Sequence, residues 1–326
     1  MTAEVLHELL TNGRAFSASY GGGMSNHFPM ALLALERLGA DDRRLREFAA
    51  FYEKRLRRKA ADGPALPGDG WRSALGRSEL EVPLAAMLAD EVRHAGAEAV
   101  LRDVLPALTP GIGAAAFHGV IRTAYAVDSG DDADVPDALT SWIIAYDDLR
   151  GEGSEALRFT KAAEAFDAMH GDDRFPKDLK GASISGRIEA IAAMPGFADY
   201  RHSIAAVALP DLARIAVAIY LDRADFTALH MVTGCHAARV LAPYLAADAL
   251  DHLATALLGA YATIGRPAFD VDADVSGSAA DWDALAARAI LSNDDHDLKF
   301  VYSCREEEAV YGWGLHRRAA AMRLER

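Results

Sequence analysis

The spacing of apolar residues most restricts how this chain can fold. Alanine and leucine recur at intervals of three and four residues along nearly the whole sequence, as in "FPMALLALERL" at residues 28–38. Alternating runs of β-branched residues bounded by turn residues are almost absent. An interval of three to four residues places apolar side chains on one face of an α-helix, whereas a half-buried strand requires strict alternation. The pattern therefore predicts an all-α fold.

The expected helices cover most of the chain, and segments rich in glycine, proline and aspartate separate them. Their ranges are 1–11, 29–38, 41–60, 78–105, 111–128, 136–149, 153–170, 184–194, 197–219, 222–243, 246–264, 279–291 and 294–319. The longest expected loop covers 265–278. A chain of 326 residues, of which 51% are hydrophobic, suits one large domain or two smaller ones.

Charge and cysteine content exclude several classes of partner and site. Lysine and arginine number 34 against 48 aspartates and glutamates, and the formal charge of -14 disfavours nucleic acid and anionic membranes. No apolar run reaches the length of about 18 residues that a membrane span needs. Cys235 and Cys304 lack C-x-x-C spacing, so no disulfide framework or zinc knuckle is indicated. Since no signal peptide is recognisable, we expect a cytoplasmic protein; no oligomeric state is indicated.

Two glycine-rich segments do not predict a phosphate-binding loop. "GEGSEA" at 151–156 fits G-x-G-x-x-A but follows "AYDDLR", which is not a buried strand. "GGG" at 21–23 lacks the Lys-Ser/Thr of a P-loop and is typical of a turn before a helix. A nicotinamide cofactor such as NADPH is therefore possible but has no support from the sequence. Nucleophile elbows of the G-x-S-x-G type are also absent.

Five of the eleven histidines lie in apolar or structured surroundings: His27, His118, His230, His236 and His296. Imidazole binds iron, zinc and copper, and an all-α protein gathers such ligands from several helices. His230 and His236 lie about 240° apart on a straight helix, so both cannot point at one centre unless Gly234 permits a distortion. We favour His230 as a ligand and His236 as a contact to a ligand or to the substrate. No E-x-x-H pair occurs near these histidines, which disfavours a dinuclear carboxylate site.

A histidine site of this kind lacks an anionic ligand, and this draws attention to "NDDHDLK" at 293–299. His296 and Lys299 are three residues apart, so on a helix they project from one face about 60° apart in azimuth. A lysine ammonium repels a metal ion. The pair is therefore either ordinary helix surface or part of unusual chemistry.

Four blocks of the sequence carry a resemblance to a known family. "SNHFPMALLALERLGA", "FHGVIRTAYAV", "HMVTGCHAARVL" and "NDDHDLKFVYSCREEEA" resemble, in order, the blocks of the questin oxidase-like family, whose members act on anthraquinones and related polyketides. The blocks span residues 25–308, so we expect a single all-α domain over 1–326 with a buried metal site between helices. The resemblance implies an oxygenase, whose reaction could have a Baeyer-Villiger-like outcome. It also implies a mononuclear non-haem iron, Fe(II), held by histidines and a carboxylated lysine. Carried over, the metal ligands are His27, His118, His230, His296 and Lys299.

The lysine of this set is chemically suited to become an anionic ligand, and other residues near the set are candidates for acting on the substrate. A buried lysine loses its proton readily, and its neutral amine adds carbon dioxide to form an anionic carbamate. Arg122, one turn after His118, either holds a phenolate or carboxylate of a small aromatic substrate that reacts with O2 or forms an ordinary salt bridge. Tyr125 replaces a histidine of the family pattern, and His236 matches a further family histidine; both are candidate catalytic residues. Asn293 and Asp294 either orient ligands or cap a helix.

Two other functions are compatible with these residues. In a helical His-Asp metallophosphohydrolase, His296 and Asp297 would be ligands of a divalent metal. In a non-catalytic helical binding protein, the histidines would only be packed. Stoichiometric iron and oxygen uptake distinguish the oxygenase from both.

Overall fold

The computed structural model describes residues 2–68, 70–149, 151–154, 156–181, 183–273 and 280–326. Within these ranges the chain forms fifteen α-helices, several short 3-10 turns and one two-stranded hairpin, so the all-α prediction is confirmed. The α-helices are α1 (Thr2–Gly13), α2 (Phe28–Arg37), α3 (Asp42–Tyr52), α4 (Glu81–Ala95), α5 (Ala97–Leu108), α6 (His118–Ser129), α7 (Val135–Ile144), α8 (Ala162–His170), α9 (Ile184–Ala192), α10 (Leu209–Arg223), α11 (Phe226–Leu241), α12 (Ala249–Thr263), α13 (Trp282–Leu291), α14 (Asp295–Tyr311) and α15 (Leu315–Leu324).

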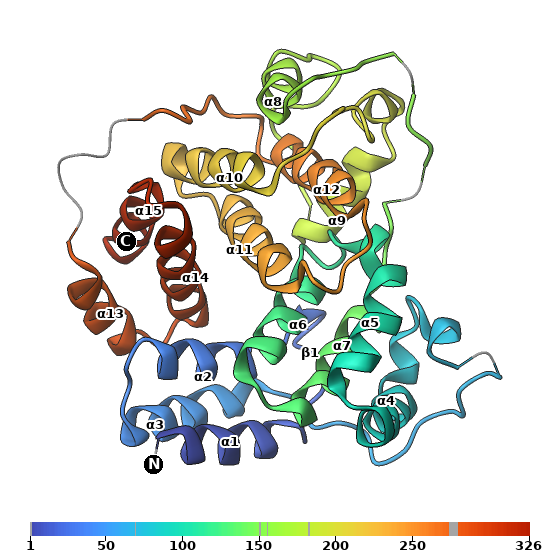
Figure 1. Cartoon of the computed structure of the whole chain (residues 1–326), viewed down its shortest axis with the longest axis vertical. Helices are drawn as coiled ribbons and strands as arrows, with labels where there is room; N and C mark the ends of the chain where they lie inside the picture. Colours follow the sequence, from blue (N-terminus) through green and yellow to red (C-terminus); the bar gives the residue numbers. More distant parts are fainter. Residues whose placement is uncertain (1, 69, 150, 155, 182, 274–279) are drawn as a thin grey trace.

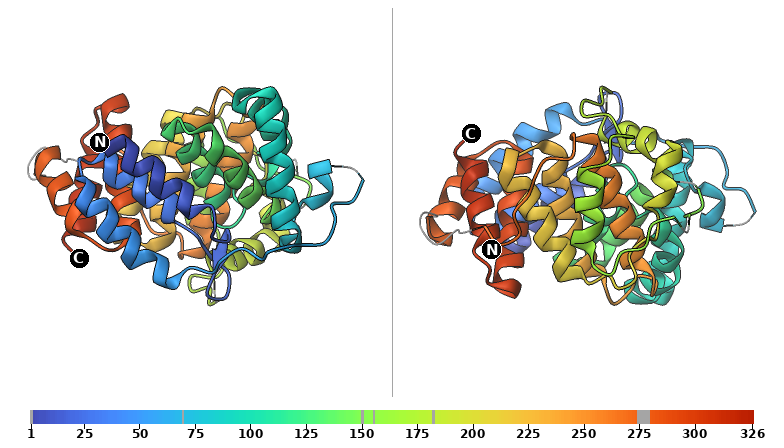
Figure 2. Two further views of the ribbon diagram at one scale, coloured as in Figure 1. Left: turned by 90° about the horizontal axis from the view of Figure 1, so that it is seen from below. Right: turned by 90° about the horizontal axis from the view of Figure 1, so that it is seen from above.

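Helix α11 runs through the middle of the molecule (Figure 1). It packs against α6, α10, α12 and α14, and it buries 13 of its 16 residues. A helix that is apolar on nearly every side is stable only inside a core. Helices α1 to α3 and α13 to α15 lie at one end of the molecule, and α4 and α5 lie at the other (Figures 1 and 2).

Four helices form a closed ring of contacts that positions the candidate site. Helix α2 packs on α6 and α14, and both of these pack on α11. The buried apolar residues on these helices belong to one contiguous core. Side chains at the ends of the four helices can therefore meet at one point.

Two of the long expected helices are each two helices. The range 78–105 is divided between α4 and α5 at Gly96, which has φ 88° and ψ 153°. The range 294–319 is divided between α14 and α15 at Gly312, which is left-handed with φ 65°. Glycine adopts such conformations without the steric cost of a Cβ atom, so it ends each helix.

Other expected helices are shorter than predicted. Helix α6 begins at His118 rather than near 111, because the three residues before it have positive φ. Regular α-helix ends at Tyr52 in the range 41–60 and at Ile144 in 136–149. It begins only at Ala162 in 153–170 and at Leu209 in 197–219.

The glycine-rich segments form irregular structure. Residues 21–23 connect strands β1 (Ser19–Tyr20) and β2 (Met24–Ser25) in a hairpin just before α2, as expected for a turn. In "GEGSEA", 151–154 carry no helix or strand, and residue 155 lies outside the described residues. The expected loop 265–278 is irregular over 266–273, and its remainder, 274–278, lies outside the described part.

No α-helix in the described ranges has the length and apolar character needed to cross a membrane.

Candidate metal centre

Four of the predicted histidines meet where α2, α6, α11 and α14 converge. His27 immediately precedes α2, His118 begins α6, His230 lies in the second turn of α11, and His296 lies in the first turn of α14. Ring centroids are 4.7 Å apart for His27 and His118, 4.8 Å for His27 and His296, 4.8 Å for His118 and His230, and 5.7 Å for His230 and His296. The rings thus form a closed group of four, here called the histidine cluster.

Backbone carbonyl groups fix the orientation of two rings. His230 Nδ1 donates to the Phe226 carbonyl oxygen at 2.8 Å, and His118 Nδ1 donates to the carbonyl oxygen of Ala115. A carbonyl oxygen accepts only, so Nδ1 carries the proton in both rings and Nε2 keeps its lone pair. Metal-binding histidines commonly donate their other ring N–H in this way.

Asp295 fixes a third ring, and sequence reasoning missed it. Its Oδ2 lies 2.5 Å from His27 Nδ1 and 3.3 Å from His296 Nδ1, and its Oδ1 lies 3.9 Å from an Arg55 nitrogen. His27, Asp295 and His296 each place a possible metal-binding atom within 4.8 Å of the other two. The sequence did contain a signal that could have identified Asp295: it precedes Lys299 by four residues, and this spacing puts both side chains on one face of a helix.

Three nitrogen atoms in the histidine cluster have no partner in the part of the chain that the structure describes. They are the Nε2 atoms of His27, His118 and His230, and all three are buried. Leaving a buried polar atom unpaired costs about 1–3 kcal/mol. Three unpaired lone pairs on neighbouring rings fit a cation that the imidazoles would share.

Burial keeps these imidazoles neutral. Desolvation lowers the pKa of His27, His118 and His230 well below its usual value, and neighbouring groups of the histidine cluster lower it further. Desolvation also lowers the pKa of His296, followed by the charge of Lys299. Neutral imidazole is the form that binds a metal, so the site is ready for one at neutral pH.

Lys299 lies one turn after His296 in α14, with only 3% of its surface exposed. Its Nζ forms no hydrogen bond or ion pair with any residue that the structure describes. Desolvation lowers the pKa of Lys299 to about 8, while the charges of Asp295 and Asp294 oppose this shift. A buried amine with this pKa is more often neutral, and therefore more nucleophilic, than an exposed lysine.

Asp294 and Asn293 have different roles. Asp294 caps α14, because its Oδ1 accepts from the backbone N–H of His296 at 2.9 Å, and the same oxygen lies 3.2 Å from His296 Nδ1. It therefore both caps the helix and contacts the ring. Asn293 accepts from Arg44 Nη2 at 3.0 Å through Oδ1.

Asp297, the metal ligand expected for a phosphohydrolase, is engaged elsewhere. Its Oδ1 accepts from Arg323 Nε at 2.6 Å, and its Oδ2 accepts from the Ser292 hydroxyl at 2.6 Å. Neighbouring residues of a helix point about 100° apart, so Asp297 and His296 diverge. Asp297 is not part of the histidine cluster.

His236 lies outside the histidine cluster as well, on the opposite side of α11. Its Nδ1 lies 2.8 Å from Glu307 Oε1, which also accepts from Arg239 Nε at 2.7 Å. Helix α11 is continuous. Gly234 does not distort it but allows close packing, because a Cβ atom there would lie 3.0 Å from the Phe117 ring.

Tyr125 lies in the core between these two groups. Its hydroxyl donates to the Lys299 carbonyl oxygen at 3.2 Å and lies 3.3 Å from Ser303 Oγ, and its ring centroid is 6.4 Å from that of His236. Tyr125 thus contacts the backbone of α14 and the ring of His236.

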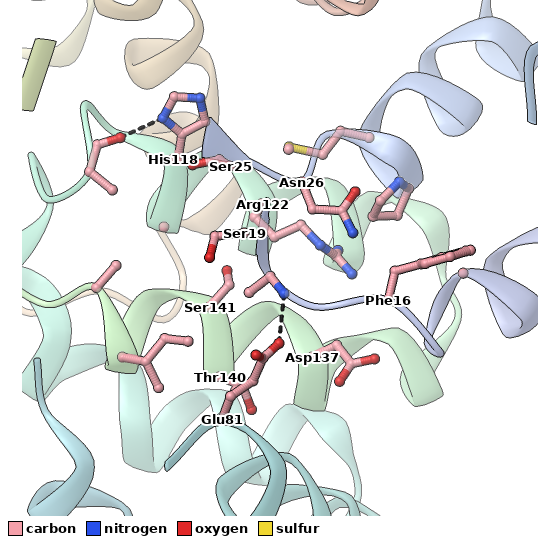
Figure 3. Close-up of a pocket in the computed structure, with 18 of the residues that line it drawn as sticks. Phe16, Ser19, Ser25, Asn26, Glu81, His118, Arg122, Asp137, Thr140 and Ser141 are labelled. Atoms are coloured by element: carbon pink, nitrogen blue, oxygen red, sulfur yellow. Dashed lines mark hydrogen bonds between the residues drawn. The ribbon is translucent and has the colours of Figure 1, made fainter. Parts of the chain in front are cut away.

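A cavity of about 320 Å³ reaches the histidine cluster at His118 (Figure 3). Apolar side chains in its wall include Leu10, Phe16 and Ile144. Arg122 also lines it and is buried, but both of its terminal nitrogens donate to Asp134, at 2.7 and 2.6 Å. The cavity therefore presents a neutralised ion pair rather than a lone cation. His236 and Tyr125 are not among the residues that line it.

Comparison with known families agrees with the resemblance of the sequence blocks. A family model described as questin oxidase-like matches residues 24–304, a range that contains all four rings of the histidine cluster and Lys299. No curated protein matches the chain. The chain belongs to the questin oxidase-like family, and this membership supports an oxidoreductase, an oxidase or oxygenase of polyketide-type substrates.

Proposed function

We propose that this questin oxidase-like protein is an oxygenase with a mononuclear non-haem Fe(II) centre, which uses O2 to oxidise or ring-open a small aromatic, polyketide-like substrate. The observation that carries this proposal is the histidine cluster with its three buried, unpaired Nε2 atoms. Imidazole is a good ligand for iron, and the neutral rings need no deprotonation before they bind it. The cavity at His118 offers the substrate a place beside the centre.

His27, His118, His230 and His296 would hold the iron through their imidazoles, and Lys299 would supply the anionic ligand. When bound, Fe(II) supplies the one-electron chemistry that O2 needs in order to react with an electron-rich aromatic ring. Asp295 and the carbonyl oxygens of Ala115 and Phe226 hold three of the rings in place. Their role is to keep each Nε2 lone pair directed inward.

Lys299 would first become a carbamate. The neutral Nζ attacks the carbon of CO2 and loses one proton to solvent, so that an amine and CO2 give N–COO⁻ and H⁺. The low pKa of Lys299, about 8, favours the neutral amine that this step requires. The product replaces a buried cation with a carboxylate, a second anion beside the four imidazoles in addition to Asp295.

The cavity would select the substrate and exclude water from it. Its mixed wall, with Leu10, Phe16 and Ile144 among many polar residues, suits an aromatic ring that carries hydroxyl or keto groups. The Arg122–Asp134 pair suits a phenol or ketone better than a free carboxylate, which would have to displace Asp134. Tyr125 and His236 would act indirectly, by holding α14 through Lys299 and Glu307. We therefore propose positioning roles for these two residues in place of substrate contact.

Metal analysis of anaerobically purified protein tests the centre. We expect one iron per chain in the wild type and its loss in His118→Ala and His296→Ala. His94→Ala is the matched control, because His94 is exposed and, among the described residues, its ring bonds to the carbonyl oxygen of Asp90 alone. A fully occupied sample without iron, or undiminished metal in both cluster variants, would contradict the proposal.

Oxygen consumption tests the source of electrons. The irregular segment 151–154 gives no nucleotide-binding unit, so we expect an electron-rich aromatic substrate to drive oxygen uptake without NADPH. Uptake that requires NADPH would show that a reductant site has been overlooked. Phosphatase activity with Mg²⁺ or Mn²⁺ and no oxygen uptake would instead favour the phosphohydrolase.

A further inference from the structure

The histidine cluster is approached from two sides. His27 and His230 are buried, whereas His118 and His296 are partly exposed. His118 lies in the wall of the cavity. His296, with 17% of its side chain exposed, is not among the residues that line the cavity, so its exposure reflects a second approach.

Phe226 covers this second approach. Its ring centroid lies 4.6 Å from that of His296 and 4.8 Å from that of His230, with interplanar angles of 62° and 77°. At the same time 46% of Phe226 is exposed. A single exposed phenylalanine is ordinary, but this one packs edge-to-face against two imidazoles of the cluster. One part of its ring therefore faces solvent while another part packs on these two imidazoles.

The backbone around Phe226 is held firmly, so its side chain is the movable part. Phe226 is the first residue of α11, and the Asp225 carboxylate caps that helix by accepting from Thr227 N at 2.6 Å. Arg326 donates to the carbonyl oxygens of Ala224 and Arg223, both at 2.7 Å. Rotation of the ring about its two side-chain torsions would expose the cluster without moving the helix.

We propose that Phe226 is a gate through which small solutes reach the metal centre from solvent, while the aromatic substrate uses the cavity at His118. This inference rests on the proposed metal site. An apolar ring over the ligands excludes water, and the apolar shell of a metal site controls solvent access to it. The gate would let small molecules exchange while a bound substrate fills the cavity.

Removal of a redox-inert metal tests the gate. Wild type, Phe226→Ala, Phe226→Leu and Ile144→Ala are each loaded with one Zn²⁺, and its release to an excess of a small chromogenic chelator is followed by absorbance. Ile144→Ala is the matched control, since it shortens an apolar side chain in the cavity wall. We expect release from Phe226→Ala to be about tenfold faster, a change of roughly 1.4 kcal/mol in the barrier. Phe226→Leu and Ile144→Ala should stay near the wild-type rate.

Equal release rates in Phe226→Ala and wild type, with full zinc loading in both, would overturn the gate and leave the metal centre standing. Faster release from Ile144→Ala than from Phe226→Ala would assign small-solute access to the cavity and would also overturn it. Failure of the wild type to hold stoichiometric metal would remove both proposals. Thermal unfolding of each variant establishes that the rates refer to folded protein.

Discussion

Helices α11 and α14 carry two buried histidine groups that differ in how their charges are balanced. Near the start of both helices lies the histidine cluster, in which three Nε2 atoms have no partner in the described structure. Further along lies the group of His236, Arg239 and Glu307, in which one carboxylate oxygen accepts from both basic residues. The second group contains its own counter-charge, whereas the first leaves three lone pairs unpaired, which is the reason for proposing a metal there. Burial of histidine alone therefore does not indicate a metal site, and neither does a single unpaired ring, because both ring nitrogens of the buried His316 also lack a partner in the described structure. Unpaired nitrogens on several adjacent rings are what supports the proposed centre.

The sharpest test of this comparison uses two histidines of one helix. His230→Ala removes an unpaired donor of the cluster, so we expect no stoichiometric metal and oxygen uptake at the background rate. His236 lies six residues later in the same helix, and the His236→Ala variant should keep the full metal content. Metal analysis and oxygen electrodes measure both. Loss of metal in both variants, or in neither, would erase the distinction between the two groups.

The second largest effect concerns the group that needs no metal. Glu307→Ala leaves His236 and the partly exposed Arg239 without their carboxylate, and truncation of a buried pair costs about 3–5 kcal/mol. We expect the free energy of unfolding, measured by urea denaturation, to fall by about 3 kcal/mol, the lower end of this range. The metal content should not change. Glu306→Ala, at the more exposed neighbouring position, is the control. A variant that loses metal but not stability would reverse the assignment.

Asp295 should have a moderate effect on the metal. Asp295→Asn keeps the shape of the side chain but removes the charge beside His27 and His296. Outer partners of metal-binding histidines typically contribute 10–100-fold to affinity, which is roughly 1.4–2.7 kcal/mol. Competition titration with a chelator measures this change. Complete loss of metal would instead make Asp295 a direct ligand, as its place beside His27 and His296 also allows.

The fold and most of the histidine cluster could be predicted from the sequence. The three-to-four residue spacing identified an all-α fold, because the periodicity of a helix is a local property. The breaks at Gly96 and Gly312 were missed, since a single glycine costs only about 1 kcal/mol within a helix and does not by itself end one. The sequence blocks identified His27, His118, His230 and His296, and the structure brings these four together.

What the sequence could not predict depends on how helices meet. Phe226 reads as an ordinary apolar residue at a helix start, and its contact with His296 exists only because the starts of α11 and α14 converge. The sequence analysis considered Asp294 and His296 but not Asp295, which lies between them in the same acidic segment. For Arg122 the sequence left a substrate contact and an ordinary salt bridge both open, and the structure shows the salt bridge, with Asp134 twelve residues away. The sequence did not identify Asp134 as the partner.

Both groups should also make the fold more stable as the pH rises, each in its own pH window. Although burial opposes ionisation of Glu307, hydrogen bonds from His236 and Arg239 hold the pKa of Glu307 below its usual value. Glu307 therefore stabilises the fold above the unfolded pKa of about 4.3, and this contribution is lost as the pH falls through the lower folded pKa.

Lys299 acts in the same direction over a higher pH window. Desolvation lowers its pKa to about 8, so between pH 8 and about 10.4 the unfolded chain binds more protons than the folded one. In metal-free protein kept without CO2, stability should therefore rise with pH over this window, by at most about 1.4 kcal/mol per pH unit. Urea denaturation at several pH values measures the slope, and Lys299→Met should abolish it. A slope that persists in Lys299→Met would assign the titration to another group. A wild type that lacks the slope, even without metal and CO2, would mean that Lys299 is not held as a buried amine, and the path from amine to carbamate would lose its starting point.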